Sequence, residues 1–65
     1  MNKDSFIEQW NMLADVDKTP VRAIYTICGN EFEADRYKAY DDEALLYLHD
    51  YPSGRIQYDT IRRMI

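Results

Sequence analysis

The apolar positions near the start of the chain repeat with the period of an α-helix. Apolar side chains recur at helical spacing at Phe6, Ile7, Trp10, Leu13 and Ala14. Ser5 and Glu8 have the spacing of a capping box, in which a hydroxyl and a carboxylate bind free N–H groups of the first turn. We therefore predict a helix over about residues 5–15, with Trp10 in the core against a sheet and residues 17–19 as a linker.

After Pro20 the pattern changes to short segments rich in β-branched and aromatic residues. Such segments favour strands, and the Gly, Asn, Pro and Asp between them favour turns. The predicted strands cover about residues 20–28, 31–40, 44–49, 55–58 and 61–65. The predicted turns cover residues 28–31, 41–43 and 52–54.

The second predicted strand changes its inward-facing phase partway along. Phe32 and Ala34 follow one alternation, whereas Tyr37 and Ala39 follow the other. This slip predicts a β-bulge near Asp35, and a bulge allows a sheet to bend strongly. We expect an α+β, mostly β domain over residues 1–65: an N-terminal helix followed by a strongly bent five-stranded antiparallel sheet that closes into a small barrel.

The end of the chain is consistent with two structures. Residues 58–61 fit a single 3₁₀ turn that leads into a short edge strand. Alternatively, Ile61, Met64 and Ile65 line one side of a terminal helix. We favour the strand.

Size and composition indicate how such a small domain is stabilised. A chain of 65 residues buries only about 60% of its unfolded surface, so small domains often need a supplement. The single cysteine, Cys28, excludes an intramolecular disulfide, and one Cys with one His makes no zinc site. Self-association remains, so we expect a homo-oligomer, with Cys28 buried as a small apolar residue in a reducing compartment.

The net charge is −4, which argues against binding nucleic acid through a uniformly basic face. Arg55, Arg62 and Arg63 form the only basic cluster in the sequence. No apolar run approaches the roughly 18 residues of a membrane span, and the N-terminus leads into an amphipathic segment. We expect a cytoplasmic protein without a membrane partner.

Several residues in order along the chain are similar to the Hfq family of Sm-like proteins. They are Pro20-Val21, Ile24-Tyr25, Gly29, Tyr40-Asp41, Leu45-Leu46, Tyr58 and Ile61. The resemblance implies an Sm-like, SH3-like small barrel that assembles into an oligomer and binds single-stranded RNA. It also implies base stacking on Tyr25, with the Gly29 and Asn30 backbone nearby.

The chain departs from the family at other positions. Ala34 replaces a glycine of the second strand, Asp42-Glu43 replace a Gln-Phe pair, and Asp59-Thr60 replace a Lys-His pair. Carboxylates repel RNA phosphates, so the family's pore-side site is not expected here. Only the Tyr25 face remains, and Glu31 stands there in place of a common lysine.

No residue pattern supports catalysis, a cofactor or a metal site. The chain has no Gly-rich phosphate loop, and the acidic run of residues 41–43 lacks the alternate spacing of a cation loop. His49 is expected at a solvated strand end. The protein is therefore predicted to be a binding protein and not an enzyme.

Three functions remain open. The first is a divergent Hfq-like RNA-binding or regulatory oligomer, with adenine-rich single strands on the Tyr25 face. The second is a small acidic inhibitor from a phage or mobile element that binds a host nucleic-acid-binding protein, as a nucleic-acid mimic. Its contact residues would be Tyr40, Asp41, Asp42, Glu43 and Tyr51. The third is a ring or dimer subunit without RNA contact.

The tyrosines bear on this choice. There are six, more than one small core accommodates with satisfied hydroxyls. Packing is expected for Tyr37, Tyr47 and Tyr58, whereas Tyr40 and Tyr51 adjoin charged turns and suit either an interface or a surface position without a function.

Overall fold

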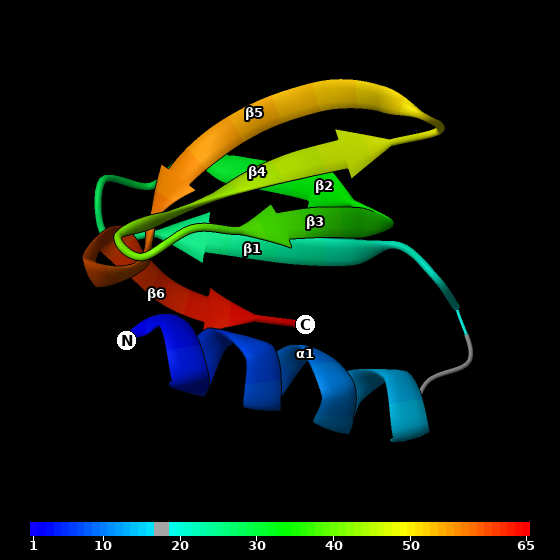
Figure 1. Cartoon of the computed structure of the whole chain (residues 1–65), viewed down its shortest axis with the longest axis horizontal. Helices are drawn as coiled ribbons and strands as arrows, with labels where there is room; N and C mark the ends of the chain where they lie inside the picture. Colours follow the sequence, from blue (N-terminus) through cyan, green and yellow to red (C-terminus); the bar gives the residue numbers. More distant parts are fainter. Residues whose placement is uncertain (17–18) are drawn as a thin grey trace.

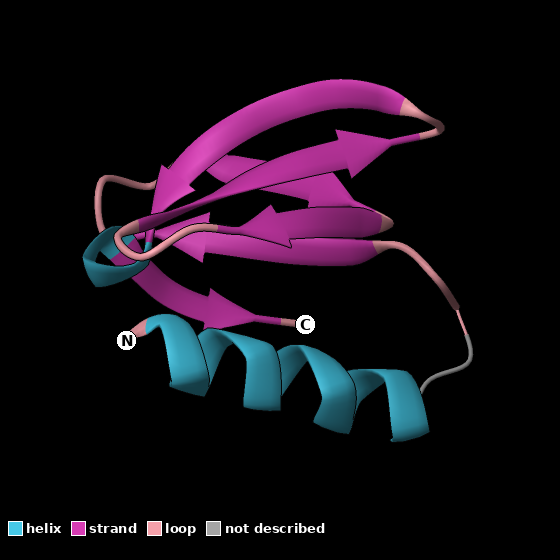
Figure 2. Ribbon diagram, viewed as in Figure 1, coloured by secondary structure: helices cyan, strands magenta, loops and turns pink. Residues whose placement is uncertain are grey.

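The chain folds into one helix followed by six strands within residues 1–16 and 19–65, which this computed structural model describes. The elements are α1 (Lys3–Val16), β1 (Arg22–Thr26), β2 (Glu31–Ala34), β3 (Arg36–Ala39), β4 (Glu43–Leu48), β5 (Tyr51–Gln57), the 3₁₀ helix η1 (Tyr58–Thr60) and β6 (Ile61–Met64). The strands form two three-stranded antiparallel sheets, ordered β2-β1-β6 and β3-β4-β5 (Figures 1 and 2). The predicted α+β, mostly β class is confirmed. Asp17 and Lys18, predicted as part of the linker, lie outside the described residues.

The predicted single sheet of five strands is not what the structure contains. The strand expected over residues 31–40 is divided at Asp35 into β2, which pairs with β1, and β3, which pairs with β4. The backbone N–H of Asp35 donates to the carbonyl of Tyr47 on β4 at 2.8 Å. Asp35 therefore directs the chain from one sheet to the other at the point where the phase slip was predicted. Among the described residues no ladder joins β5 to β6, so the strands do not close into a barrel.

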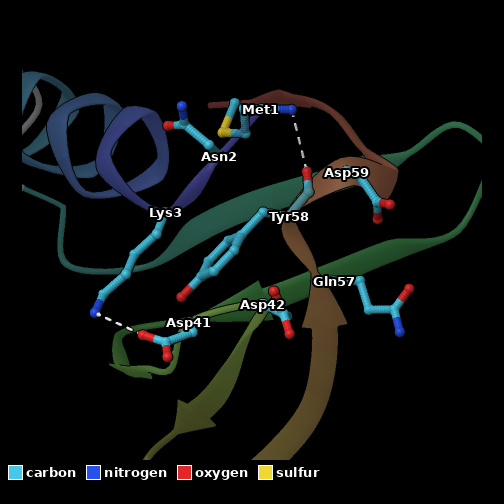
Figure 3. Close-up of a pocket in the computed structure, with 8 residues that line it drawn as sticks. All are labelled: Met1, Asn2, Lys3, Asp41, Asp42, Gln57, Tyr58 and Asp59. Carbon is cyan, nitrogen blue, oxygen red and sulfur yellow. Dashed lines mark hydrogen bonds and ion pairs between the residues drawn. The ribbon is translucent and has the colours of Figure 1, made fainter.

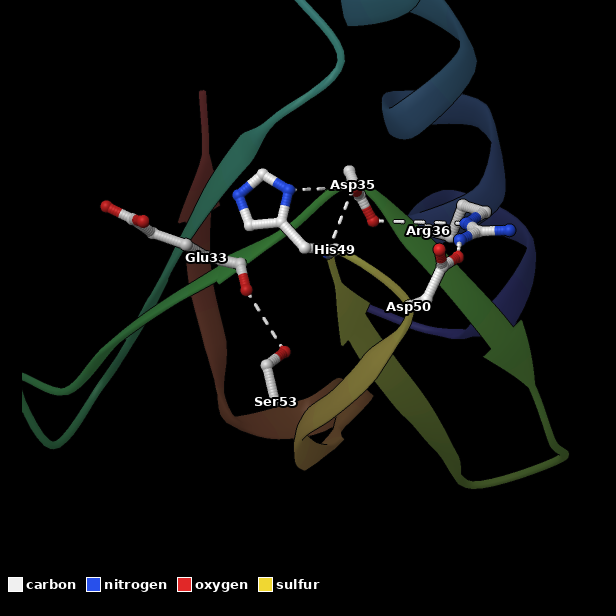
Figure 4. A network of polar contacts seen from close by, with 6 residues as sticks. All are labelled: Glu33, Asp35, Arg36, His49, Asp50 and Ser53. Carbon is white, nitrogen blue, oxygen red and sulfur yellow. Dashed lines mark hydrogen bonds and ion pairs between the residues drawn. The ribbon is translucent and has the colours of Figure 1, made fainter.

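Side-chain contacts around Asp35 hold the two sheets together (Figure 4). The carboxylate of Asp35 accepts a hydrogen bond from the backbone N–H of His49 at 3.2 Å. Arg36 Nε lies 3.9 Å from the other carboxylate oxygen of Asp35. The hydroxyl of Ser53 on β5 donates to the carbonyl of Glu33 on β2 at 3.1 Å. These contacts fasten the start of β5 and the turn before it to the junction of β2 and β3.

The turn between β4 and β5 lies earlier than predicted. His49 and Asp50 have φ values of 52° and 70°, as in the two-residue turns that suit the twist of a hairpin. The turn predicted over residues 52–54 is wrong, because this segment belongs to β5. Gly54 serves a packing role there: a Cβ on it would lie 3.0 Å from the ring of Phe32, so any other residue would require that ring to move.

Aromatic side chains attach α1 to the β structure. Phe6 is fully buried, and its ring centroid lies 5.1 Å from that of Tyr37 and 5.4 Å from that of Tyr58. The Trp10 ring packs on Tyr37 at 4.8 Å, as expected for a core tryptophan.

Arg22 is also buried, with 2% of its surface exposed. The core consists of Phe6, Trp10, Ile24, Ala34, Ala44, Leu46, Ile56, Tyr58, Ile61 and Met64.

The helix begins earlier than predicted, because a different residue caps it. The side chain of Asn2 accepts the backbone N–H of Ser5 at 2.8 Å, the bond of an N-cap. Ser5 lies within α1, which begins at Lys3, so the predicted capping box of Ser5 and Glu8 is wrong. Ala14, expected on the buried face, is exposed.

The first hairpin turns tightly after Thr26. Gly29 has a φ of 86° and donates its N–H to the carbonyl of Thr26 at 3.0 Å, and the N–H of Thr26 donates to the carbonyl of Asn30 at 2.9 Å. A positive φ favours glycine at this position. Cys28 lies in this turn and is exposed. Its predicted burial is therefore wrong, because β1 ends two residues before it.

The end of the chain adopts the favoured alternative. Tyr58–Thr60 form the 3₁₀ helix η1, and Ile61–Met64 pair with β1 as the edge strand β6. Ile61 and Met64 are both buried. The terminal helix is thus excluded.

Replacing Phe6 should test how strongly the helix is attached. Phe6→Ala removes a fully buried ring and should lower the free energy of unfolding by about 3–5 kcal/mol. Urea unfolding followed by Trp10 fluorescence at fixed protein concentration measures the change. Phe6→Leu should cost less, and Met12→Ala, whose side chain is 55% exposed on the same helix, should change the free energy by less than about 0.5 kcal/mol. Equal effects of Phe6→Ala and Met12→Ala would contradict this account.

Candidate functional site

Tyr25 lies on β1, the central strand of the first sheet, between two residues of opposite charge. The strand register pairs Tyr25 with Glu31 on β2 and with Arg63 on β6. Paired residues of an antiparallel ladder extend from the same face of the sheet. The guanidinium of Arg63 lies over the Tyr25 ring, with its Cζ 4.7 Å from the ring centroid, which is within cation–π range.

A hollow of about 310 Å³ opens beside this pair. Its lining residues are Tyr25, Thr26, Gly29, Arg62 and Arg63. Successive side chains of a regular strand point to opposite faces. Here Tyr25 pairs with Arg63 and Thr26 with Ile61, so the register shifts and Arg62 is an extra residue on β6. This irregularity explains how both exposed arginines line one hollow.

The structure brings together two of the three residues predicted to bind RNA. Tyr25 and Gly29 line this hollow, whereas Asn30 lines a separate one with Cys28. The backbone N–H of Asn30 donates to Thr26 Oγ1 at 3.0 Å, so it maintains the turn. The guanidinium of Arg63 lies over one face of the Tyr25 ring, a contact that the residue pattern did not predict.

Arg62 and Arg63 are the site residues that the residue pattern did not assign. The sequence pointed to them only as part of the basic cluster that includes Arg55, and the three arginines of that cluster do not lie together in the structure. Arg55 lies elsewhere, 3.4 Å from Glu43 on β4. Arg62 and Arg63 lie beside Tyr25 because β6 pairs with β1. These two strands are distant in sequence, so the local residue pattern does not predict their pairing.

A second candidate surface is acidic. A hollow of about 400 Å³ is lined by Met1, Asn2, Lys3, Asp41, Asp42, Gln57, Tyr58 and Asp59 (Figure 3). Lys3 Nζ lies 3.8 Å from a carboxylate oxygen of Asp41, whose side chain is 98% exposed. An ion pair this exposed contributes little to stability. Asp42 and Asp59 are exposed too, so this end of the molecule presents carboxylates to solvent.

The predicted protein-contact residues are only partly together. Tyr40, Asp41, Asp42 and Glu43 line one continuous hollow of about 510 Å³ with Gln57. Tyr51 pairs with Leu48 at the opposite end of the β4–β5 hairpin, away from this turn. Tyr51 is 76% exposed and Tyr40 is 42% exposed.

Tyr58 forms the floor between the acidic turn and the core. Its hydroxyl donates to the carbonyl of Tyr40 at 2.6 Å, and the amino group of Met1 donates to the carbonyl of Tyr58 at 3.2 Å. Burial raises the pKa of Tyr58, and the nearby Tyr37 and Asp41 raise it further.

Residues 1–16 and 19–65, the part of the chain that the structure describes, include neither a metal-binding cluster nor a helix that could span a membrane. No group of three or more His, Cys, Asp and Glu side chains there has an arrangement that would hold a metal ion. No helix there is both long enough and apolar enough to cross a membrane.

The raised pKa of Tyr58 predicts a loss of stability at alkaline pH. The folded protein retains the Tyr58 proton more strongly than the unfolded chain does, so its contribution is complete below pH 10, the ordinary value, and decreases as pH rises through the folded pKa. Tyr58→Phe should remove this part of the pH dependence and cost about 1 kcal/mol at neutral pH for the lost hydrogen bond. Urea unfolding between neutral and alkaline pH measures both effects. Tyr51→Phe, at an exposed position, should match the wild type, and identical alkaline profiles for wild type and Tyr58→Phe would refute the assignment.

Comparison with known proteins gives no relative for this chain. No protein-family model matches it. No curated protein and no solved structure matches it either. Inference about function therefore depends on the geometry of the Tyr25 face and of the acidic end.

Proposed function

We propose that the protein is a divergent Sm-like subunit that binds single-stranded RNA on the Tyr25 face and acts as an oligomer. The observation that carries the proposal is the hollow in which Tyr25, Gly29, Arg62 and Arg63 meet. Aromatic rings and guanidinium planes stack on bases, and arginines bind phosphates in single-stranded nucleic acids. The hollow combines these groups at the surface of a sheet.

The order of elements supports the Sm-like part of the proposal. When β2 and β3 are counted as one strand bent at Asp35, the chain has one helix followed by five strands. This is the order that the resemblance to Hfq implies. The 3₁₀ helix η1 lies between the last two strands.

The free sheet edges support the oligomer. β5 is the outer strand of one sheet and β6 is the outer strand of the other. An exposed edge strand presents backbone groups that pair readily with another chain. Pairing of β6 with β5 of a neighbouring copy covers both edges and places the Tyr25 hollows of successive copies in a series, which suits an extended RNA strand.

The local charge at the hollow is compatible with RNA despite the net charge of −4. Arg62 and Arg63 both line the hollow, and its lining residues include no carboxylate. The exposed carboxylates of Asp41, Asp42 and Asp59 line a different hollow. Binding through two arginines predicts a weak dependence on salt, with a slope of log K against log salt of about −1.4 for a single strand at each subunit.

RNA binding should be measured by fluorescence anisotropy with a labelled, short, A-rich RNA at low salt. Tyr25→Ala should weaken binding by roughly tenfold through lost stacking, and Arg63→Gln should weaken it and reduce the salt slope by about 0.7. Lys38→Gln is the matched control, since it removes the same charge from β3 in the other sheet, where the ammonium contacts Tyr40.

Light scattering of the same samples should give a mass of two or more times the 7.8 kDa of one chain. Absence of binding to any single-stranded RNA at low salt would refute the function. Equal losses in Lys38→Gln and Arg63→Gln would refute the location of the site.

The acidic end favours a second function, which is binding to a host nucleic-acid-binding protein. Asp41, Asp42 and Asp59 are exposed around one hollow beside the exposed ring of Tyr40. Clustered carboxylates attract a basic nucleic-acid groove, and exposed tyrosine is typical of protein interfaces.

Affinity capture from a host extract should separate this function from the first. The double variant Asp41→Lys, Asp42→Lys should lose a nucleic-acid-binding partner that the wild type retains. Glu8→Lys, Asp15→Lys makes the same charge change at exposed positions on α1 and should retain that partner. If both double variants behave alike, the acidic turn is not the contact surface.

A further inference from the structure

The row Glu31–Tyr25–Arg63 places a carboxylate beside the aromatic surface of the candidate RNA site. Both outer residues pair with Tyr25 in the ladder, so the three side chains leave the same face of the sheet in one line. Glu31 and Arg63 are both exposed. Within the described residues the Glu31 carboxylate takes part in no ion pair, which leaves its oxygens available to a ligand.

The three side chains offer different chemistry to a nucleotide. Tyr25 with Arg63 above it supplies a flat surface for stacking. Arg62 and Arg63 supply N–H donors for phosphate. An ionised glutamate only accepts hydrogen bonds, through two oxygens in one plane.

The four bases differ in how well their edges suit a carboxylate. Guanine presents two neighbouring donors, N1–H and the N2 amino group, which match the two carboxylate oxygens. Adenine and cytosine each present one amino group beside a ring nitrogen that accepts, and the carboxylate repels that nitrogen. Uracil presents one N–H between two carbonyl oxygens, which is the least favourable edge. Bidentate, charge-assisted pairs are the stronger kind of hydrogen-bonded contact.

We propose that Glu31 makes the Tyr25 site selective for guanine in single-stranded RNA. The base stacks on the Tyr25–Arg63 pair, its N1–H and N2 amino group donate to the Glu31 carboxylate, and its phosphate lies against Arg62. This inference rests on the proposed function. It gives a role to Glu31, whose negative charge would otherwise only repel RNA phosphates at this face.

The neighbouring acid on β2 provides an internal comparison. Glu33 pairs with Ala23, two residues along from Tyr25, so it lies on the same face in the next row. Glu33 is exposed, as Glu31 is. Its row has alanine in place of the aromatic ring, so Glu33 has no stacking surface beside it.

The experiment uses short uridine RNAs with one central position changed to guanosine, adenosine, inosine or left as uridine, with affinities measured by fluorescence anisotropy. The wild type should bind the guanosine RNA roughly tenfold more tightly than the all-uridine RNA. Inosine lacks the N2 amino group, so its affinity should fall between the two. Glu31→Gln should reduce the guanosine preference to about twofold or less, because an amide offers one acceptor oxygen in place of two.

Glu33→Gln is the matched control, because it removes the same charge from the same face. Glu33→Gln should bind all the RNAs somewhat more tightly through reduced repulsion, whereas Glu31→Gln should do so only for the RNAs without guanosine and should lose the preference for guanosine. An unchanged preference in Glu31→Gln, or an equal loss in Glu33→Gln, overturns the proposal. Equal wild-type affinity for every RNA overturns the guanine selectivity and leaves the RNA-binding function standing, whereas absence of binding to all of them overturns both.

Discussion

The contact of Phe6 with Tyr37 and Tyr58 joins the helix to both halves of the β structure. Tyr37 belongs to β3 in the second sheet, and Tyr58 belongs to η1, which leads directly into β6 of the first sheet. Phe6 is fully buried between them. No ladder connects β5 to β6 in the described chain, so packing takes the place of backbone pairing there. A domain of this size buries a comparatively small fraction of its unfolded surface, so each contact of this kind matters to its stability.

Asp35 also joins the two sheets, through its backbone and through its carboxylate. Its backbone bonds to β4, and its carboxylate accepts from the turn that begins β5. Gly54 then allows β5 to approach the Phe32 ring on β2. The two sheets are thus joined through Asp35 and the close approach at Gly54 as well as through Phe6.

Charges of opposite sign lie on different surfaces of this acidic protein. The carboxylates of Asp41, Asp42 and Asp59 gather around the N-terminal end of α1, whereas Arg62 and Arg63 line the hollow beside Tyr25. A net charge of −4 therefore describes no single face of the molecule. In physiological salt, interactions between exposed charges are largely screened beyond about 8 Å. A ligand at one surface therefore interacts mainly with the charges of that surface.

The sequence by itself determined those features that depend on neighbouring residues. The apolar period predicted α1, the glycine of the first hairpin predicted its turn, and the phase slip near Asp35 predicted where one strand would change direction. The cap at Asn2 and the turn at His49 were missed, because in both regions a competing local signal, Ser5 with Glu8 and the segment 52–54, was stronger in the pattern. The burial of Arg22 was not predicted, since arginine is usually exposed.

Only the tertiary structure decided which groups meet at the Tyr25 face. Arg63 and Glu31 approach Tyr25 through two separate ladders, and the register shift on β6 adds Arg62. A shift of one residue in either ladder would turn a different side chain toward Tyr25. The local sequence determines which side chains of a strand alternate between the two faces of the sheet. The register between two paired strands depends instead on how segments distant in sequence pack together. Most of the elements were therefore predictable, and the two arginines that line the hollow beside Tyr25 were not.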